Sequence, residues 1–209
     1  MRALVATLIC LGLMASLGAC KPAGGAGAVT ADDMSLGSAT APVTVVEYAS
    51  LGCPICTIWN NTVFPTFKAK YVDTGKVRYV FREFLTGDLS VASAGFLLAR
   101  CAGKDRYFQV LDAVFHQEQP FLETERNAEK RDALVKVAES AGMTEAQFDA
   151  CVNSDQSILA LKARSDKWAG DDHIETTPTY VINGKVYNNG AMSMDDLDKA
   201  IAAAQAGAK

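Results

Sequence analysis

Two cysteines, Cys53 and Cys56, are separated by two residues in the stretch EYASLGCPICTIW, residues 47–59. A pair with this spacing can form a structural disulfide, supply two ligands of a metal site, or exchange electrons with other thiols. As a structural link it would close a very small loop and would constrain the unfolded chain little. As half of a zinc site it would need two more ligands, and His116 and His173 form no recognisable ligand pair. The spacing and its surroundings therefore favour a redox use.

The compartment bears on that choice, and the first residues of the chain indicate it. An apolar run over residues 3–19 follows Arg2, is slightly short for a membrane span, and ends in Leu17-Gly18-Ala19-Cys20. This ending resembles the lipobox of bacterial lipoproteins, in which residues 1–19 would be removed as a signal peptide, together with Cys10, and a lipid would be attached to Cys20. An uncleaved anchor and a plain secretory signal are the alternatives. Each of these places the rest of the chain outside the cytoplasm.

Composition indicates a short tether followed by one domain. Residues 20–35 are rich in Ala and Gly and poor in large apolar side chains, so we expect a flexible tether there. The rest of the chain has the length of one ordinary domain with its own core. The net charge is −4, and no block of Lys and Arg occurs. This argues against a nucleic-acid partner and against binding to acidic membranes by charge.

Four of the six cysteines remain after the signal peptide and the lipidation site are set aside. In an oxidising compartment an even number of cysteines suggests two disulfides, and four thiols allow three connectivities. The simplest pairing is Cys53–Cys56 with Cys101–Cys151. We interpret the second pair as a structural clamp on a helical region, stabilising by about 4 kcal/mol in the loop-entropy account. A regulatory redox role for Cys101 and Cys151 is the alternative.

The elements around the cysteine pair follow a strand–helix–strand order. Residues 43–48, VTVVEY, predict a buried strand, and a helix with a kink at Pro65 follows from the pair onward. This order places Cys53 near the first turn of the helix, where unpaired N–H groups lie close to its sulfur. Residues 76–84 predict a second strand, parallel to the first, with Arg78 and Arg82 on a partly solvated face.

Helical patterns fill the middle of the chain, and strand character returns near its end. Thr144 and Gln147 fit a capping box within the helical region. Residues 177–187, TPTYVINGKVY, contain Asn183-Gly184, a strong hairpin signal, and predict antiparallel strands added to the sheet. Ser193 is expected to cap a last helix.

Two motifs in this order resemble a known fold. Cys53-Pro54-Ile55-Cys56 after a strand and Thr177-Pro178 before a hairpin strand resemble the thioredoxin fold, and the helical block between them resembles the DsbA-like branch of periplasmic thiol–disulfide oxidoreductases. The resemblance covers residues 36–203. It implies an α/β fold with a mixed central sheet flanked by helices. A thioredoxin-fold domain would comprise residues 36–87 and 168–209, with an inserted helical domain over residues 88–167.

The resemblance also implies roles for single residues. Cys53 matches the exposed nucleophile and Cys56 the buried resolving thiol. Pro178 matches the cis-proline that faces the pair, and Thr177 would offer its backbone to a substrate strand. Glu47, six residues before Cys53, matches the buried carboxylate that assists proton transfer to and from the inner cysteine. Its alternative is an ordinary carboxylate at the end of a strand.

The two residues between the cysteines are Pro54 and Ile55. The most strongly oxidising members of the family that the chain resembles have a histidine at the position of Ile55. An isoleucine side chain offers no hydrogen-bond donor to the Cys53 sulfur. The helix dipole alone supplies about 2 kcal/mol at most, or about one and a half pKa units. We therefore predict a Cys53 thiol that is more acidic than a free cysteine but less acidic than in the histidine-bearing relatives.

The function implied by the resemblance is protein disulfide exchange on the periplasmic side of a bacterial membrane, with a lipid anchor at Cys20. The Cys53–Cys56 disulfide would be donated to secreted or periplasmic proteins with cysteines, and a quinone-linked membrane partner would reoxidise the enzyme. We expect a monomer that needs no cofactor and no metal. The alternatives are a reductase or isomerase kept reduced by a membrane electron donor, a periplasmic chaperone, and a copper-handling protein that uses Cys53 and Cys56 as ligands.

Overall fold

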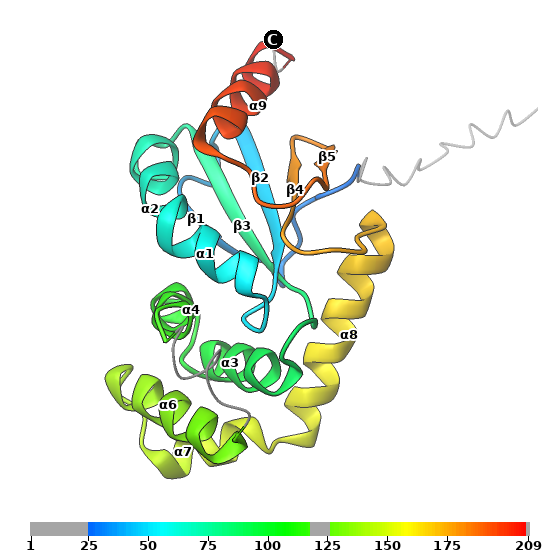
Figure 1. Ribbon diagram of the computed structural model, residues 1–209. Helices are drawn as coiled ribbons and strands as arrows, with labels where there is room; N and C mark the ends of the chain where they lie inside the picture. The colour runs from blue at the N-terminus through cyan, green and yellow to red at the C-terminus, as the bar shows by residue number, and fades with distance from the viewer. Residues whose placement is uncertain (1–24, 118–125, 208–209) are drawn as a thin grey trace, which may run out of the picture.

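A five-stranded mixed sheet forms the centre of the molecule in the computed structural model, which describes residues 25–117 and 126–207 (Figure 1). The strand order is β1-β3-β2-β4-β5. The central strands β2 and β3 are parallel, and the pairs β1–β3, β2–β4 and β4–β5 are antiparallel. The predicted parallel unit with an added hairpin is therefore confirmed. The strands are β1 (Met34–Leu36), β2 (Val43–Ala49), β3 (Val77–Glu83), β4 (Thr179–Ile182) and β5 (Lys185–Tyr187).

Helices cover the sheet and form a separate block at one end of it (Figure 1). One face of the sheet carries α1 (Pro54–Thr62), α2 (Phe64–Phe67) with a π-helical turn over Lys68–Val72, and α9 (Met194–Gly207). The helical block comprises α3 (Leu89–Cys101), α4 (Tyr107–Phe115), α6 (Asn127–Ser140), α7 (Glu145–Val152) and the first part of α8 (Asp155–Asp172). The last part of α8 returns along the sheet, where Trp168 packs on the opposite face. The fold class expected from the sequence is confirmed.

Alternation along the central strands gives each face of the sheet its own core. Val45 and Tyr79 point toward α1 and α2 and belong to the larger core. Val46, Val80 and Trp168 form a smaller core under α8. Because side chains alternate between faces along a strand, Glu47 lies on the same face as Val45 and therefore on the side of α1.

The local signals in the sequence give the expected ends of elements. The helix that starts at the cysteine pair is broken at Val63, and Pro65 lies in the first turn of the next helix, α2. Thr144 and Gln147 form the capping box of α7. Asn183 and Gly184 both have positive φ between β4 and β5, as a tight hairpin requires.

The N-terminal segment departs from the expected tether. Residues 25–35 lie against the sheet: β1 pairs with β3, and the Gly27 amide donates a hydrogen bond to Asp172 over 2.8 Å. Asp33 and Met34 are buried. The prediction of a flexible tether is therefore wrong for residues 25–35. The small residues of this segment permit close packing against the sheet, and the carboxylate of Asp33 forms an ion pair with a buried cation.

That cation is Arg82, which corrects a second expectation. The sequence predicts Arg82 on a partly solvated face, but the residue is only 2% exposed. Its guanidinium forms ion pairs with Asp33 and Asp172, each at 2.9 Å, and also donates to the Ala28 carbonyl. Ion pairing allows the charge to be buried. The network joins the N-terminal segment, β3 and the end of α8.

Two further expectations concern the start of the chain and the boundary between the predicted domains. The lipobox and Cys20 lie outside the described residues. Among the residues that are described, no helix combines the length and the apolar character needed to cross a membrane. The predicted limit between the two domains at residues 167 and 168 falls inside α8, so one continuous helix belongs to both parts of the predicted division.

Candidate active site

Cys53 lies between the end of β2 and the start of α1, and the local sequence explains this position. Cys53 is the N-cap of α1, and Pro54 occupies the first helical turn, where its missing N–H costs nothing. The Sγ atom of Cys53 accepts a hydrogen bond from the backbone N–H of Cys56 at 3.4 Å. The sulfur thus receives one of the N–H groups left unpaired at a helix start, as the sequence predicts.

The turn before Cys53 is held against the loop that leads into α3. The Asp88 amide donates to the Gly52 carbonyl over 3.0 Å, and the Ser50 hydroxyl donates to the Thr86 carbonyl over 2.8 Å. A Cβ atom at Gly87 would lie 1.9 Å from the Gly52 carbonyl oxygen, and Gly87 has a φ of +71°. Only glycine fits there. These contacts fix the position of Cys53 relative to the end of β2.

The loop that contains Thr177 and Pro178 meets the cysteine pair. The Thr177–Pro178 peptide bond is cis, as the resemblance implies. The Cys53 thiol lies 3.7 Å from the Thr177 carbonyl oxygen. The structure therefore brings together two motifs that are 124 positions apart in the sequence.

Accessibility at the pair differs from expectation in one respect. Both thiols are free; Cys56 is fully buried, and Cys53 is only 8% exposed. The description of Cys53 as an exposed residue is therefore wrong, because the cis-proline loop and the helix start cover most of it. Exposed neighbours rim the sulfur, since Pro54 is exposed and Ile55 is 53% exposed. A second polypeptide could approach the Cys53 sulfur only past these exposed side chains.

The two thiols have opposite acidities. A hydrogen bond from the Cys56 thiol lowers the pKa of Cys53 to about 5. Further hydrogen bonds from the Thr177 side chain and from the backbone N–H groups of Ile55 and Cys56 act in the same direction. Burial raises the pKa of Cys56 well above its usual value, and its hydrogen bond to Cys53 adds to this. The expectation that Cys53 is more acidic than a free cysteine agrees with this direction. Much of the effect comes from the neighbouring thiol rather than from the helix dipole alone.

Glu47 lies in β2 beneath the pair and is almost completely buried. Burial raises its pKa to about 8; the hydrogen bond from Tyr79 opposes the rise, and the charge of Cys53 adds to it. Glu47 in turn raises the pKa of Cys56. A carboxyl group with these properties is protonated at neutral pH and interacts electrostatically with both thiols, which a general acid for the inner cysteine needs.

Sequence reasoning missed Tyr79 as part of this site. The Tyr79 hydroxyl donates to Glu47 Oε2 at 2.5 Å, and both residues are buried. A tyrosine on the core face of a strand carries a signal, because its hydroxyl needs a buried partner. Identifying that partner requires the register of β2 against β3, which the sequence does not state.

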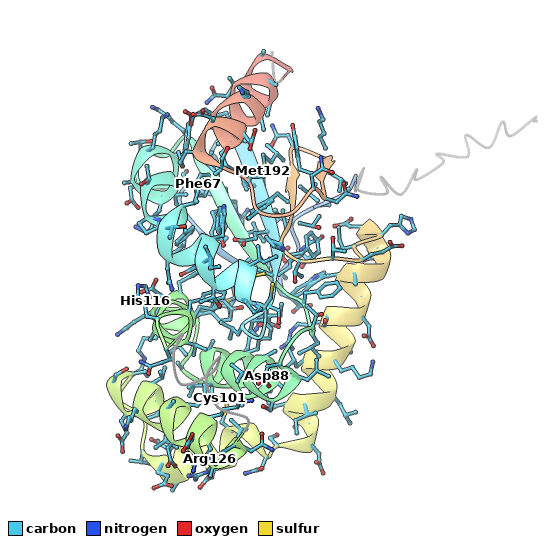
Figure 2. The ribbon with its side chains drawn as sticks, in the orientation of Figure 1. Phe67, Asp88, Cys101, His116, Arg126 and Met192 are labelled. Atoms are coloured by element: carbon cyan, nitrogen blue, oxygen red, sulfur yellow. A yellow bond between two sulfur atoms is a disulfide. The ribbon has the colours of Figure 1, made fainter. Side chains whose placement is uncertain are left out.

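The second cysteine pair lies apart from this site, in the helical block. Cys101 at the end of α3 and Cys151 in α7 form a disulfide, with the pairing expected from the sequence (Figure 2). The bond joins two helices whose cysteines are 50 positions apart in the chain. A structural clamp remains our interpretation of it.

His116 and His173 are exposed and lie outside the site. Within residues 25–117 and 126–207, no cluster of three or more His, Cys, Asp or Glu side chains has an arrangement that could hold a metal ion.

A strand-to-helix dithiol facing a cis-proline loop, on a mixed sheet with an inserted helical block, defines the class of thioredoxin-fold dithiol proteins. The family model described as thioredoxin matches residues 29–203. The chain belongs to the thioredoxin superfamily, in its DsbA-like branch.

Relatives of known name agree with this assignment. The chain is 32% identical over 171 residues to a Rickettsia prowazekii relative named as a protein-disulfide oxidoreductase, covering 81% of this chain and 60% of the relative. It is 26% identical over 171 residues to disulfide bond formation protein D of Bacillus subtilis, covering 79% and 74%. The chain thus spans about 60% of the length of the rickettsial relatives that it matches.

Solved structures give the same result for the fold. The crystal structure of α-DsbA1 from Wolbachia pipientis matches with a TM-score of 0.75 and 25% identity, over 86% of this chain and 94% of that one. Oxidised BdbD from Bacillus subtilis matches with a TM-score of 0.72 and 23% identity, over 84% and 94%. The latter likeness concerns the fold alone.

Proposed function

We propose that this protein is a thiol–disulfide oxidoreductase that donates its Cys53–Cys56 disulfide to proteins with cysteines. The observation that carries the proposal is geometric: Cys53 caps the start of α1 next to the buried Cys56 and lies 3.7 Å from the carbonyl oxygen of Thr177, whose bond to Pro178 is cis. In keeping with this position, hydrogen bonds lower the pKa of the Cys53 thiol to about 5. At neutral pH such a group is a thiolate, which stabilises the reduced form of the enzyme. A stabilised reduced form makes the disulfide a strong oxidant. The names of the relatives support the same activity.

The exchange proceeds in two displacements. A substrate thiolate attacks Cys53 Sγ, a mixed disulfide forms, and the Cys53–Cys56 bond breaks with Cys56 as the leaving thiolate. Because the pKa of Cys56 is strongly raised, this thiolate needs a proton, and the protonated Glu47 is the nearby acid that supplies it. A second substrate thiolate then attacks the substrate sulfur of the mixed disulfide and releases Cys53 as a thiolate. Two electrons have passed from the substrate to the enzyme.

The backbone near Pro178 gives a place for an extended substrate segment. Thr177 is half-buried, and its carbonyl already lies beside the reacting sulfur. Pairing of main chain with main chain is largely independent of the substrate sequence, which suits an enzyme that acts on many proteins.

The first residues of the chain support a proposal for its location, and the family resemblance supports one for its redox partner. We propose a protein on the periplasmic side of a bacterial membrane, anchored by a lipid on Cys20. Reoxidation of the dithiol requires an electron acceptor, and a quinone-linked membrane protein is the partner that the family resemblance implies. Mass spectrometry of the mature N-terminus tests the anchor: the expected product begins at a lipid-modified Cys20, and an unmodified one excludes it.

The direction of electron flow is tested by an equilibrium redox titration against glutathione. We expect a potential closer to about −120 mV, the range of strong oxidants, than to about −270 mV, the value for a reducing thioredoxin. A potential near the lower value would instead support the reductase alternative, in which a membrane donor keeps Cys53 and Cys56 reduced.

The variant Cys53→Ser separates exchange from binding. An oxidoreductase loses its activity with this change, because the attacking and leaving sulfur is gone. A holding chaperone would keep its activity in the same variant, and a copper-handling protein would show bound metal in the purified reduced wild type. Either result would contradict the proposed function.

A further inference from the structure

We infer that Tyr79 is a positioning residue for Glu47, because its hydroxyl holds one oxygen of the buried carboxyl and leaves the other to exchange a proton. The inference deepens the role of Glu47 in the proposed function and rests on it. The bond that carries it runs from the Tyr79 hydroxyl to Glu47 Oε2 at 2.5 Å.

The register of the two central strands brings the residues together. Tyr79 pairs with Val45, and Glu47 pairs with Phe81, two positions further along the parallel strands. Side chains two positions apart point to the same face of a sheet. The phenol of Tyr79 therefore reaches diagonally across to the carboxyl of Glu47, on the face covered by α1.

Aromatic neighbours hold the Tyr79 ring in place. Its ring centroid lies 4.9 Å from that of Phe64, 5.9 Å from Phe67 and 6.1 Å from Phe108. Phe67 belongs to α2, which lies across this face of the sheet (Figure 2). With rings from α2 and α4 packed around it, the phenol is held in one orientation. A donor held in this way orients its acceptor.

The other ionisable groups around Glu47 come from β4 and from the start of α1. Tyr180 on β4 pairs with Glu47 in the sheet, and the hydroxyl of Tyr180 has no hydrogen-bond partner within the described residues. Cys53 and Cys56 approach from the start of α1, and each is coupled to Glu47 by charge. In the described part of the chain, neither a lysine nor an arginine forms an ion pair with Glu47.

A neutral donor has a different effect from a cation. A phenol hydrogen bond favours the charged carboxylate moderately, so it lowers the pKa of Glu47 against the rise caused by burial. The Tyr79 hydroxyl itself stays protonated, because burial raises its pKa well above the usual value. Tyr79 is thus a permanent donor to Oε2, and the proton that Glu47 gives and takes belongs on Oε1.

The variant Tyr79→Phe tests the inference, with Tyr107→Phe as the matched control. Tyr107 is also buried, but its hydroxyl donates to Glu83 at 3.1 Å and not to Glu47. The readout is the ¹³C NMR titration of the Glu47 carboxyl in the reduced protein. We expect Tyr79→Phe to raise the titration midpoint of Glu47 by about one pH unit or more, and Tyr107→Phe to leave it in place.

A wild-type measurement guards against a variant that fails to fold. The ¹³Cζ resonance of Tyr79 should shift with pH at the same midpoint as the Glu47 carboxyl. An unchanged Glu47 midpoint in Tyr79→Phe, an equal shift in Tyr107→Phe, or a Tyr79 resonance that ignores the Glu47 titration would each overturn the inference.

The rate of reaction separates this inference from the proposed function. If Glu47→Gln leaves the pH dependence of disulfide reduction by dithiothreitol unchanged, the proposed role of Glu47 in proton transfer fails. The midpoint measurement still decides whether Tyr79 holds the carboxyl, because it does not depend on turnover.

Discussion

Two buried glutamates on the same face of the sheet, Glu47 and Glu83, have opposite surroundings. Glu47 at β2 receives the neutral hydroxyl of Tyr79. Glu83 at the end of β3 is 0% exposed and receives Arg100 at 2.5 Å and Arg164 at 3.2 Å, as well as the Tyr107 hydroxyl. Its contacts with Arg100 on α3 and Arg164 on α8 join the sheet to the helical block. Glu47, which accepts a hydrogen bond from a neutral phenol and has its pKa raised to about 8 by burial, can gain and lose a proton near neutral pH.

The position of each glutamate matches its surroundings. Glu47 interacts electrostatically with Cys53 and Cys56, where the proposed exchange would move protons. Glu83 binds Arg100 from α3 and Arg164 from α8, so its charge holds the two parts of the molecule together. The two buried carboxyl groups thus differ in their partners, a neutral hydroxyl for Glu47 and two guanidinium groups for Glu83. The following predictions test whether this difference sets their roles.

The largest effect is expected for Glu83→Gln, because this change leaves two partly buried arginines without their anion. Breaking a buried ion pair by removing one partner costs about 3–5 kcal/mol. Urea denaturation at neutral pH measures the loss in the free energy of unfolding. Glu47→Gln is the control, and we expect no loss at neutral pH. The wild type must bind a proton at Glu47 on folding, at a cost of up to about 3 kcal/mol at pH 7, and the amide removes that cost. Equal losses would remove the distinction between the two sites.

The next effect is the pH dependence of stability that Glu47 imposes. Its folded pKa of about 8 lies above its ordinary value of 4.5. Between these values the folded state holds one more proton than the unfolded state, so stability falls as pH rises, by up to about 1.4 kcal/mol per pH unit. Below pH 4.5 the contribution is fully present, and above pH 8 it is lost.

The reduced wild type hides part of this slope, because Cys53 has the opposite sign. Its lowered pKa adds stability as pH rises above about 5. We therefore expect the slope of Glu47 to emerge as the difference between Cys53→Ser and the double variant Cys53→Ser/Glu47→Gln. Two parallel stability curves over pH 4.5–8 would show that Glu47 titrates at its ordinary value.

A smaller effect, in rate rather than stability, is expected for Glu47→Gln. Without an acid for the leaving Cys56 thiolate, reduction of the enzyme disulfide by dithiothreitol should slow by about tenfold at pH 7, equal to about 1.4 kcal/mol in barrier. Stopped-flow measurement of the single turnover detects it. Glu83→Gln, compared in conditions where it is folded, should retain the wild-type pH dependence of the rate.

The smallest effect is expected for Tyr107→Phe. Glu83 keeps both arginines in this variant, so the change removes one neutral hydrogen bond worth about 1 kcal/mol. Thermal or urea unfolding measures the loss. A cost as large as that of Glu83→Gln would mean that the phenol, and not the ion pairs, anchors the glutamate.

The sequence predicts the reaction centre better than its supports. Cys53 and Cys56 at a strand–helix junction, and Thr177-Pro178 before a hairpin, are local patterns that short stretches of chain predict. That the two motifs meet, and that Glu47 belongs with them, is implied by the family resemblance. Tyr79 is not predicted, because its partner depends on the register between two strands.

Long-range ion pairs explain what the sequence predicts wrongly. Arg82 reads as a solvated residue in an alternating strand, and residues 25–35 read as a tether, because each has no visible partner nearby. Arg82 and Asp33 are 49 positions apart and are buried by each other. Composition and periodicity describe each segment alone, and they carry no information about such a pair.

The docked N-terminal segment limits the distance that could separate the folded protein from a lipid anchor on Cys20. The Gly27 amide donates to Asp172 and the Ala28 carbonyl accepts from Arg82, so the chain is fixed to the sheet at these residues. If Cys20 carries the lipid, as proposed, the seven residue steps from Cys20 to Gly27 extend to about 25 Å at most. A tether of that length would keep the whole molecule close to the bilayer. Its substrates would then be proteins close to the membrane surface, and a longer segment after Cys20 would let it reach substrates farther from the membrane.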